Sequence, residues 1–219
     1  MTRAILVRHG QTTANATGIL AGRTEVDLND HGREQALALG RRLAEVPLAE
    51  AVTSPLLRTR HTLEAILGDR PVPVIDDPDL VEVEYGDWTG RELAELAKDP
   101  LWPVVQHHPA AVTFPGGESM AAMSARSVAA VRRRCLEAGE DANVLFVSHG
   151  DVIKAILADA LGLHLDGFQR IGVNPASVSI VRYVHGRPFI ERINDCGGGF
   201  EDLTVTATDE AVPGGGKGG

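Results

Sequence analysis

A chain of 219 residues is long enough for one substantial α/β domain and too short for more than two small ones. Hydrophobic residues make up 43% of it, as in soluble globular proteins, and no apolar run approaches the roughly 18 residues of a membrane-spanning helix. The formal net charge of −9 argues against nucleic acid as a partner, because phosphate backbones favour basic surfaces. We expect a cytoplasmic protein without a signal peptide and without a disulfide between Cys135 and Cys196, the two cysteines of the chain.

The amino-terminal part of the chain begins with a strand and continues to a helix. Residues 4–7 are a short apolar run and predict the first strand. A glycine-containing loop follows it. The apolar residues between positions 30 and 45 then recur at helical spacing, and we expect Asn29 or Asp30 to cap this helix.

The next segment predicts a second strand and a second helix. Residues 50–53 are a short strand-like run. Ser54 and Pro55 follow directly and predict the start of a helix, because serine favours the N-cap position and proline the first turn. Residues 69–78 are rich in proline and predict a loop with at most one brief strand.

The second half of the chain continues the alternation. Residues 92–98 predict a short helix, and a long helix is expected after residues 116–119. A strand at residues 143–147 and a helix at residues 151–161 follow. Two further strand-like runs, at residues 177–183 and 188–193, predict an antiparallel hairpin around His185 and Gly186.

This order of elements predicts a three-layer α/β/α sandwich. Its sheet should be mostly parallel with one antiparallel edge strand, and the domain should occupy residues 1–196. Residues 197–219 are rich in glycine and predict a flexible tail. The alternation of Leu203, Val205 and Ala207 could still add a weak edge strand there.

Two of the predicted strands end in the same dipeptide. Arg8-His9-Gly10 follows the first strand, and Ser148-His149-Gly150 follows the strand at residues 143–147. The carboxyl ends of parallel strands lie at one edge of a sheet, where open α/β folds bind their ligands. We therefore expect the two imidazoles to share a pocket, in which an arginine could neutralise a phosphate while an imidazole attacks phosphorus.

Five motifs in the same order and spacing resemble those of the histidine phosphatase superfamily, the phosphoglycerate mutase-like proteins. They are Arg8-His9-Gly10-Gln11-Thr12 with Asn15, Ser54-Pro55-Leu56 with Arg58 and Thr62, Leu80-Val81-Glu82 leading to Tyr85-Gly86-Asp87-Trp88, Pro115-Gly116-Gly117-Glu118-Ser119, and Ser148-His149-Gly150. The resemblance extends to about Asp195. It implies a phosphoryl-transfer enzyme that needs no cofactor and no metal ion.

The resemblance also implies a role for each site residue. His9 would be the nucleophile that forms a phosphohistidine, and His149 would donate a hydrogen bond to a phosphate oxygen. Arg8 and Arg58 would bind the phosphate, because guanidinium keeps its charge and offers forked donors. Two further sets of phosphate-binding donors are expected: the amide of Asn15, and the start of the helix after His149, which includes Gly150.

The family spacing selects Glu82 as the acid that protonates the leaving oxygen and later deprotonates the attacking water. Glu84 is its rival, because alternation along an extended segment would put both carboxylates on one face. Nearby like charge would raise the pKa of whichever carboxyl is more buried.

The residues after Glu82 favour a phosphatase over a mutase. Cofactor-dependent phosphoglycerate mutases place an arginine and a histidine directly after the catalytic glutamate, where this chain has Val83 and Glu84. We expect hydrolysis of small phosphate monoesters, and the sequence does not identify which one. The alternatives are a phosphoglycerate mutase-type enzyme and a catalytically dead relative that binds phosphorylated ligands. A metal-dependent hydrolase is a third and weaker alternative, since the chain lacks the usual metal-ligand motifs. A homodimer remains possible, and neither nucleic acid nor membrane is expected as a partner.

Overall fold

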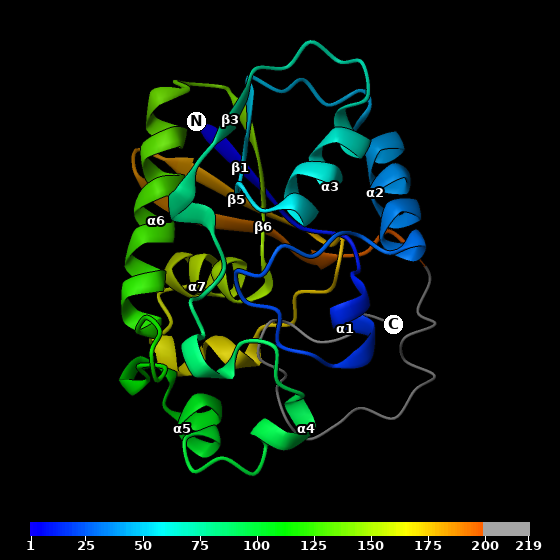
Figure 1. The fold of residues 1–219 in the computed structure, drawn as a ribbon. Coiled ribbons are helices and arrows are strands. Elements are labelled where there is room, and N and C mark those ends of the chain that lie inside the picture. Colours follow the sequence, from blue (N-terminus) through cyan, green and yellow to red (C-terminus); the bar gives the residue numbers. More distant parts are fainter. Residues whose placement is uncertain (199–219) are drawn as a thin grey trace.

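The strand that precedes His9 lies inside a six-stranded sheet of order β3-β2-β4-β1-β5-β6 (Figure 1). The computed structural model describes residues 1–198 of the chain. The strands are β1 (Thr2–Arg8), β2 (Glu50–Thr53), β3 (Val74–Asp76), β4 (Asn143–Ser148), β5 (Val178–Val184) and β6 (Arg187–Asp195). β1 to β4 run parallel, β5 runs antiparallel to β1, and β6 pairs antiparallel with β5. The sheet is therefore mostly parallel, and its expected antiparallel edge is the hairpin of β5 and β6.

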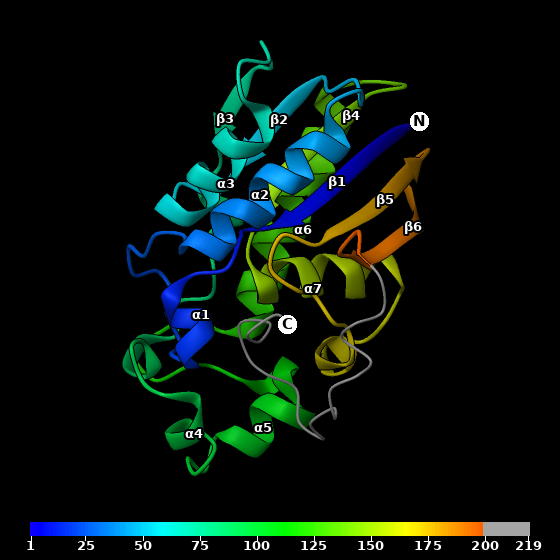
Figure 2. The ribbon, with the colours of Figure 1, turned by 90° about the vertical axis from the view of Figure 1, so that its right-hand side faces the viewer.

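Helices cover both faces of this sheet. In Figures 1 and 2, α2 (Asp30–Leu43) and α3 (Leu57–Leu67) lie on one face, and α6 (Met120–Glu137) and α7 (Gly150–Ala160) lie on the other. Successive side chains of β1 point to opposite faces of the sheet, because side chains alternate along a strand. Ile5 and Val7 join the apolar cluster under α2 and α3, and Ala4 and Leu6 join the cluster under α6 and α7. The expected three-layer α/β/α class is confirmed.

The start of α3 differs from the expectation. Asn29 caps α2 as predicted, its side chain accepting a hydrogen bond from the backbone of Gly32. Ser54 does not cap α3, which begins at Leu57 and has no side-chain cap from its own N-cap residue. Glu25 accepts a hydrogen bond from the Leu57 backbone nitrogen instead, at 3.1 Å. The Ser54 hydroxyl oxygen lies 2.8 Å from Nε2 of a histidine that follows β4, and it also accepts a 3.4 Å hydrogen bond from the Leu56 backbone nitrogen.

Short helical segments lie beyond the carboxyl ends of the parallel strands (Figures 1 and 2). They are α1 (Thr13–Thr17), η1 (Pro78–Leu80), η2 (Gly86–Trp88), α4 (Leu93–Leu96), α5 (Trp102–His107), η3 (Pro109–Ala111) and η4 (Leu165–Arg170). The expected helix at residues 92–98 is the shorter α4, and the sequence reading missed α1 and α5. Trp88 and Trp102 stack with 6.2 Å between ring centroids, which places both in the core under this layer.

Two expectations concern the ends of the chain and its relation to membranes. Across residues 1–198 we find no helix with the length and apolar character needed to cross a bilayer. The expected tail, including the strand pattern of Leu203, Val205 and Ala207, falls outside the described residues apart from Gly197 and Gly198.

Candidate active site

The two His-Gly motifs meet at the carboxyl edge of the sheet. β1 and β4 are neighbours in a register that pairs Arg8 with Ser148, so the residues that follow them come out side by side. The His9 backbone nitrogen donates to the Ser148 carbonyl at 3.0 Å. The imidazoles of His9 and His149 then pack edge to face, with 5.3 Å between their centroids. The juxtaposition expected from the sequence is present.

The surroundings of His9 leave one ring nitrogen available for attack. His9 Nδ1 lies 2.7 Å from the Gly10 carbonyl oxygen. A carbonyl can only accept, so Nδ1 carries the proton and Nε2 carries the lone pair of the neutral ring. Burial, together with the charges of Arg58 and Arg8, lowers the pKa of His9 well below 6.5. His9 is therefore a neutral imidazole near pH 7, as a nucleophile must be.

His149 is the N-cap residue of α7 and is completely buried. Its Nε2 lies 2.8 Å from the Ser54 hydroxyl oxygen. Its Nδ1 is buried and has no hydrogen-bond partner within residues 1–198. Burial is the main cause, followed by Arg58, of a pKa far below 6.5 for this ring as well. A buried polar nitrogen without a partner is costly, and a bound phosphate oxygen would relieve that cost.

Arg8 and Arg58 put two buried cations next to these histidines. They are 0% and 2% exposed, respectively. Arg8 donates from Nη1 to the Val173 carbonyl at 2.8 Å. Arg58 donates to the carbonyls of Thr24 and Gly22 at 3.0 and 2.6 Å, which ties the pocket wall to α3. Burial lowers the pKa of Arg8 to about 10, so the guanidinium still keeps its charge at neutral pH.

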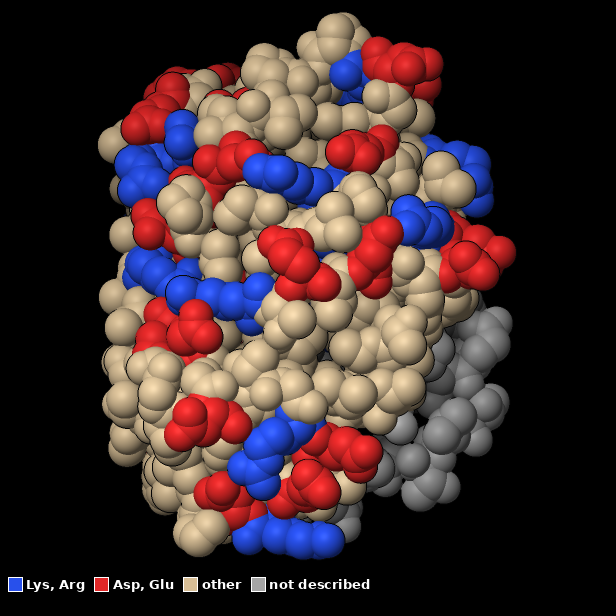
Figure 3. Space-filling model, in the orientation of Figure 1, with Lys and Arg blue, Asp and Glu red and all other residues tan. Residues whose placement is uncertain are grey.

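On one face of the molecule, charged side chains of both signs are interspersed (Figure 3). On the face shown in Figure 3, lysine and arginine side chains lie beside acidic ones. The surface charge is thus mixed there. Inside the site, Arg8 and Arg58 act in a low dielectric, where a positive charge attracts an anion more strongly than it would in water.

Glu82 supplies the carboxyl group of the site. It is 4% exposed, and its Oε1 accepts from the Val83 backbone nitrogen at 3.1 Å. Burial, and after it the nearby charge of Asp151, raise the pKa of Glu82 to about 7, against the opposing effects of the Val83 hydrogen bond, Arg58 and Arg8. A carboxyl group with this pKa can give a proton near neutral pH and take one back.

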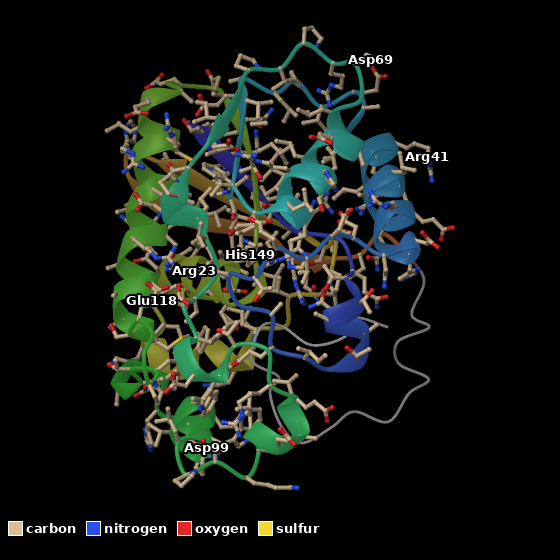
Figure 4. The ribbon with its side chains drawn as sticks, viewed as in Figure 1. Arg23, Arg41, Asp69, Asp99, Glu118 and His149 are labelled. Atoms are coloured by element: carbon tan, nitrogen blue, oxygen red, sulfur yellow. The ribbon has the colours of Figure 1, made fainter. Side chains whose placement is uncertain are left out.

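An ion-pair network that sequence reasoning missed holds the backbone of Glu82. Arg23 Nε and Arg126 Nη2 donate to the Glu82 carbonyl oxygen at 3.1 and 3.2 Å. Both arginines also donate to Glu118 Oε1, at 2.9 and 2.6 Å. Figure 4 shows Arg23 and Glu118 side by side next to α6. The acidic residue of the Pro-Gly-Gly-Glu motif therefore helps to fix the position of the proposed acid.

Asn15 and Gly150 complete the set of predicted binding residues. Asn15 lies in α1, and its Oδ1 accepts from the Thr12 backbone nitrogen and hydroxyl at 3.0 and 2.9 Å. These bonds orient the amide so that its NH₂ group is the part left to donate to a ligand. Gly150 is the first residue of α7, one position earlier than the expected start, and its N–H lies at the positive end of the helix dipole.

A pocket opens onto this cluster, with His9, Asn15, Arg58 and Glu82 in its wall. Arg8 and His149 are fully buried beside these residues. The wall away from the phosphate-binding residues is mainly apolar and includes Ile19, Leu20, Ala21 and Leu93. Within residues 1–198 there is no group of three or more His, Cys, Asp or Glu side chains arranged to hold a metal ion.

A second buried network adjoins Glu82 and was also missed. Tyr85 donates its hydroxyl proton to Asp151 Oδ2 at 2.8 Å. Lys154 Nζ lies 3.6 Å from Asp151 Oδ1 and donates to the Gln169 side chain at 3.0 Å. An acid and a lysine within the otherwise apolar helix after His149 were the sequence signal for it. Its consequence is a negative charge near Glu82 and Arg8.

Comparison with known proteins shows what this chain is similar to. A probable phosphoglycerate mutase GpmB from Erwinia tasmaniensis is 30% identical over 96% of this chain and 99% of that one. A glucosyl-3-phosphoglycerate phosphatase from Mycolicibacterium vanbaalenii is 36% identical over 78% of this chain and 79% of its own length. The solved structure of Bacillus stearothermophilus YhfR matches with a TM-score of 0.83 and 30% identity, over 89% of this chain and 98% of that one. Residues 4–196 match the family model of the histidine phosphatase superfamily (branch 1), and the chain belongs to that superfamily.

Proposed function

We propose that the protein is a phosphatase that hydrolyses small phosphate monoesters through a phosphohistidine on His9. The observation that carries the proposal is the free Nε2 of a neutral, buried His9 beside the buried cations Arg8 and Arg58. A nucleophile without charge and two permanent cations are what a dianionic phosphate requires.

In the first step, His9 Nε2 forms a bond to phosphorus as the bond to the ester oxygen breaks. Glu82 gives its proton to the leaving oxygen, which departs as a neutral alcohol. Arg8, Arg58 and His149 stabilise the charge on the remaining phosphate oxygens. This acid catalysis is typically worth about 10²–10⁴-fold in rate.

In the second step, a water molecule attacks phosphorus and the N–P bond breaks. The electron pair of that bond returns to His9 Nε2, and the Glu82 carboxylate takes the proton of the water. Inorganic phosphate leaves, and His9 and Glu82 regain their starting states. A raised pKa suits Glu82 to both roles, because the group must be protonated in one step and ionised in the next.

The choice of phosphatase over mutase rests on the two residues that follow Glu82 and on the wall of the pocket. Val83 is fully buried, and Glu84 forms an ion pair with Arg23 at 3.2 Å. Arg23 also binds Glu118, so its charge is already compensated by two carboxylates. The remaining pocket wall is mainly apolar. These features favour an alcohol without a carboxylate over phosphoglycerate, and they support hydrolysis as the outcome.

The test is a panel of phosphate monoesters that includes 3-phosphoglycerate, assayed for phosphate release and for exchange between 2- and 3-phosphoglycerate. We expect phosphate release, an acid-labile and base-stable phosphoenzyme from labelled substrate, and no label on His9→Ala. Exchange without phosphate release would identify a mutase. Binding without either reaction would identify a catalytically dead relative. Retained labelling of His9→Ala would move the nucleophile elsewhere.

A further inference from the structure

Ser54 directly follows β2, which is the neighbour of β4 in the sheet. The residue is completely buried. Its backbone nitrogen donates to the Val147 carbonyl at 3.0 Å, and its own carbonyl accepts from the Thr59 hydroxyl at 2.7 Å. These bonds hold the residue on both sides. The Ser54 hydroxyl oxygen lies 2.8 Å from His149 Nε2.

The hydroxyl of Ser54 has one proton to give. The Leu56 backbone nitrogen approaches Ser54 Oγ at 3.4 Å as a donor, so it uses a lone pair of the hydroxyl and takes no proton from it. Within residues 1–198, His149 Nε2 is the acceptor that remains for the hydroxyl proton. Buried hydroxyl groups are almost always satisfied, so the proton lies between Ser54 Oγ and His149 Nε2.

We propose that Ser54 is a positioning residue that holds His149 in the tautomer with its proton on Nδ1. The Nδ1–H group is then the donor that His149 offers to a phosphate oxygen. This inference rests on the proposed function. It assigns a role to Ser54, whose hydroxyl contacts His149 and not the substrate.

The tautomer matters because neither ring of the pair is cationic. His149 has a pKa far below 6.5, owing to its burial and to Arg58, so it cannot donate from both nitrogens near neutral pH. In the opposite tautomer, Nδ1 would turn a lone pair toward the phosphate and repel it. Ser54 prevents this by donating to Nε2.

The two histidines are thereby held in the same Nδ1–H tautomer, but they present different ring nitrogens to the phosphate. The Gly10 carbonyl keeps the proton of His9 on Nδ1 and frees Nε2 as a lone pair for attack. The Ser54 hydroxyl occupies Nε2 of His149 and frees Nδ1–H for donation. One ring supplies the nucleophile and the other supplies a hydrogen-bond donor, although both are neutral.

The chain offers a matched control for this role. Ser148 is also buried, precedes His149 directly and donates its hydroxyl proton to the Leu80 carbonyl at 2.7 Å. Ser54→Ala and Ser148→Ala therefore each remove one buried serine hydroxyl from the same edge of the sheet. Only the first removes a contact with His149.

The experiment measures histidine tautomers by ¹⁵N NMR in the wild-type protein and in both variants, with His149→Ala to assign the signal. We expect the Nδ1–H form of His149 in the wild type and in Ser148→Ala, and loss of that preference in Ser54→Ala. We also expect Ser54→Ala to lower kcat by about 10²-fold, as for the loss of an oxyanion donor. In a His149→Ala background, the same substitution should cost almost nothing more.

An Nε2–H form of His149 in the wild-type protein would overturn the proposal, whatever the variants do. So would a Ser54→Ala protein whose kcat and vanadate affinity match those of Ser148→Ala. If the wild type hydrolyses no monoester, the proposed function fails by itself. In that case, the ¹⁵N NMR tautomer of His149 and a comparison of vanadate affinity between Ser54→Ala and Ser148→Ala still decide the role of Ser54.

Discussion

Glu84 forms an ion pair with Arg23, with 3.2 Å between Oε2 and Nη1, and its side chain is 39% exposed. Glu82, two residues earlier, is buried in the pocket. Simple alternation predicted that the two carboxylates share one face, and that expectation is wrong. The Glu84 backbone nitrogen donates to Glu118 Oε1, and the Glu84 carbonyl oxygen accepts from the Glu118 backbone nitrogen, so the segment after Glu82 is held against Glu118.

This difference leads to a prediction that separates the two glutamates. Glu82→Gln should lower kcat on alkyl phosphates by about 10²–10⁴-fold, because their leaving oxygen needs a proton. The same change should affect p-nitrophenyl phosphate much less, since that leaving group is stable as an anion. Steady-state rates on the two esters measure the effect.

Glu84→Gln is the matched control. It should keep the wild-type ratio of alkyl to nitrophenyl rates, because Glu84 faces Arg23 and not the pocket. Both variants should bind vanadate, since the arginines and histidines are unchanged. A selective loss of alkyl phosphate hydrolysis in Glu84→Gln would move the general acid by two residues.

The pH dependence follows from the pKa of Glu82, which burial and Asp151 raise to about 7 against the opposing charges of Arg58 and Arg8. Glu82 must be protonated in the first step, so kcat/KM on an alkyl phosphate should fall as the pH rises through about 7. His9 sets no limit on this side, because its lowered pKa keeps it neutral there. A pH profile of kcat/KM measures this fall.

Asp151→Asn should move that fall to lower pH, because it removes a negative charge that raises the pKa of Glu82. Tyr85→Phe is the control, since it removes a hydrogen bond to Asp151 but keeps the charge of that carboxylate. A profile for Asp151→Asn that coincides with that of the wild type would show that another group titrates.

The cations of the site predict how chelators and oxyanions act. Arg8 and Arg58 supply fixed positive charge where other phosphoryl-transfer enzymes use Mg²⁺. Activity should therefore persist in excess EDTA, and vanadate should inhibit in competition with substrate. Activity that is lost on chelation and restored by a divalent ion would contradict this assignment.

The sequence predicted the sheet and the histidine pair because both depend on local patterns. The apolar runs of β1 and β4 each end in His-Gly, and parallel neighbours bring such ends together. Ser54 shows the limit of local reasoning. A serine before a proline fits a helix cap, but its hydroxyl bonds His149, 95 residues away in the chain.

The support of Glu82 could not be predicted for a related reason. Arg23, Glu118 and Arg126 are ordinary charged residues in sequence. Nothing local says that the two arginines meet at the Glu82 carbonyl group and that Glu118 binds both of them. Their meeting depends on a turn that lets two loops touch. The glycines of the Tyr-Gly and Pro-Gly-Gly motifs allow this contact, which suggests a final test.

Gly117 lies where those two loops touch. A Cβ atom there would be 2.1 Å from the Glu84 carbonyl oxygen and 2.8 Å from the Gly86 nitrogen, both of them backbone atoms that cannot rotate away. We expect Gly117→Ala to lower the free energy of unfolding by about 2–3 kcal/mol, as for overpacking of a tight site. We also expect it to displace the segment that carries Glu82.

Gly139 provides the comparison, because its φ of +81° strains an alanine but nothing lies within 4 Å of the added carbon. Gly139→Ala should cost only about 1 kcal/mol and leave catalysis unchanged. Denaturant unfolding and the ratio of alkyl to nitrophenyl hydrolysis measure the two effects. In Gly117→Ala that ratio should fall as it does in Glu82→Gln, because a displaced acid protonates a poor leaving group inefficiently. A Gly117→Ala protein with the stability of Gly139→Ala and the wild-type ratio would mean that contact between the two loops does not set the position of Glu82.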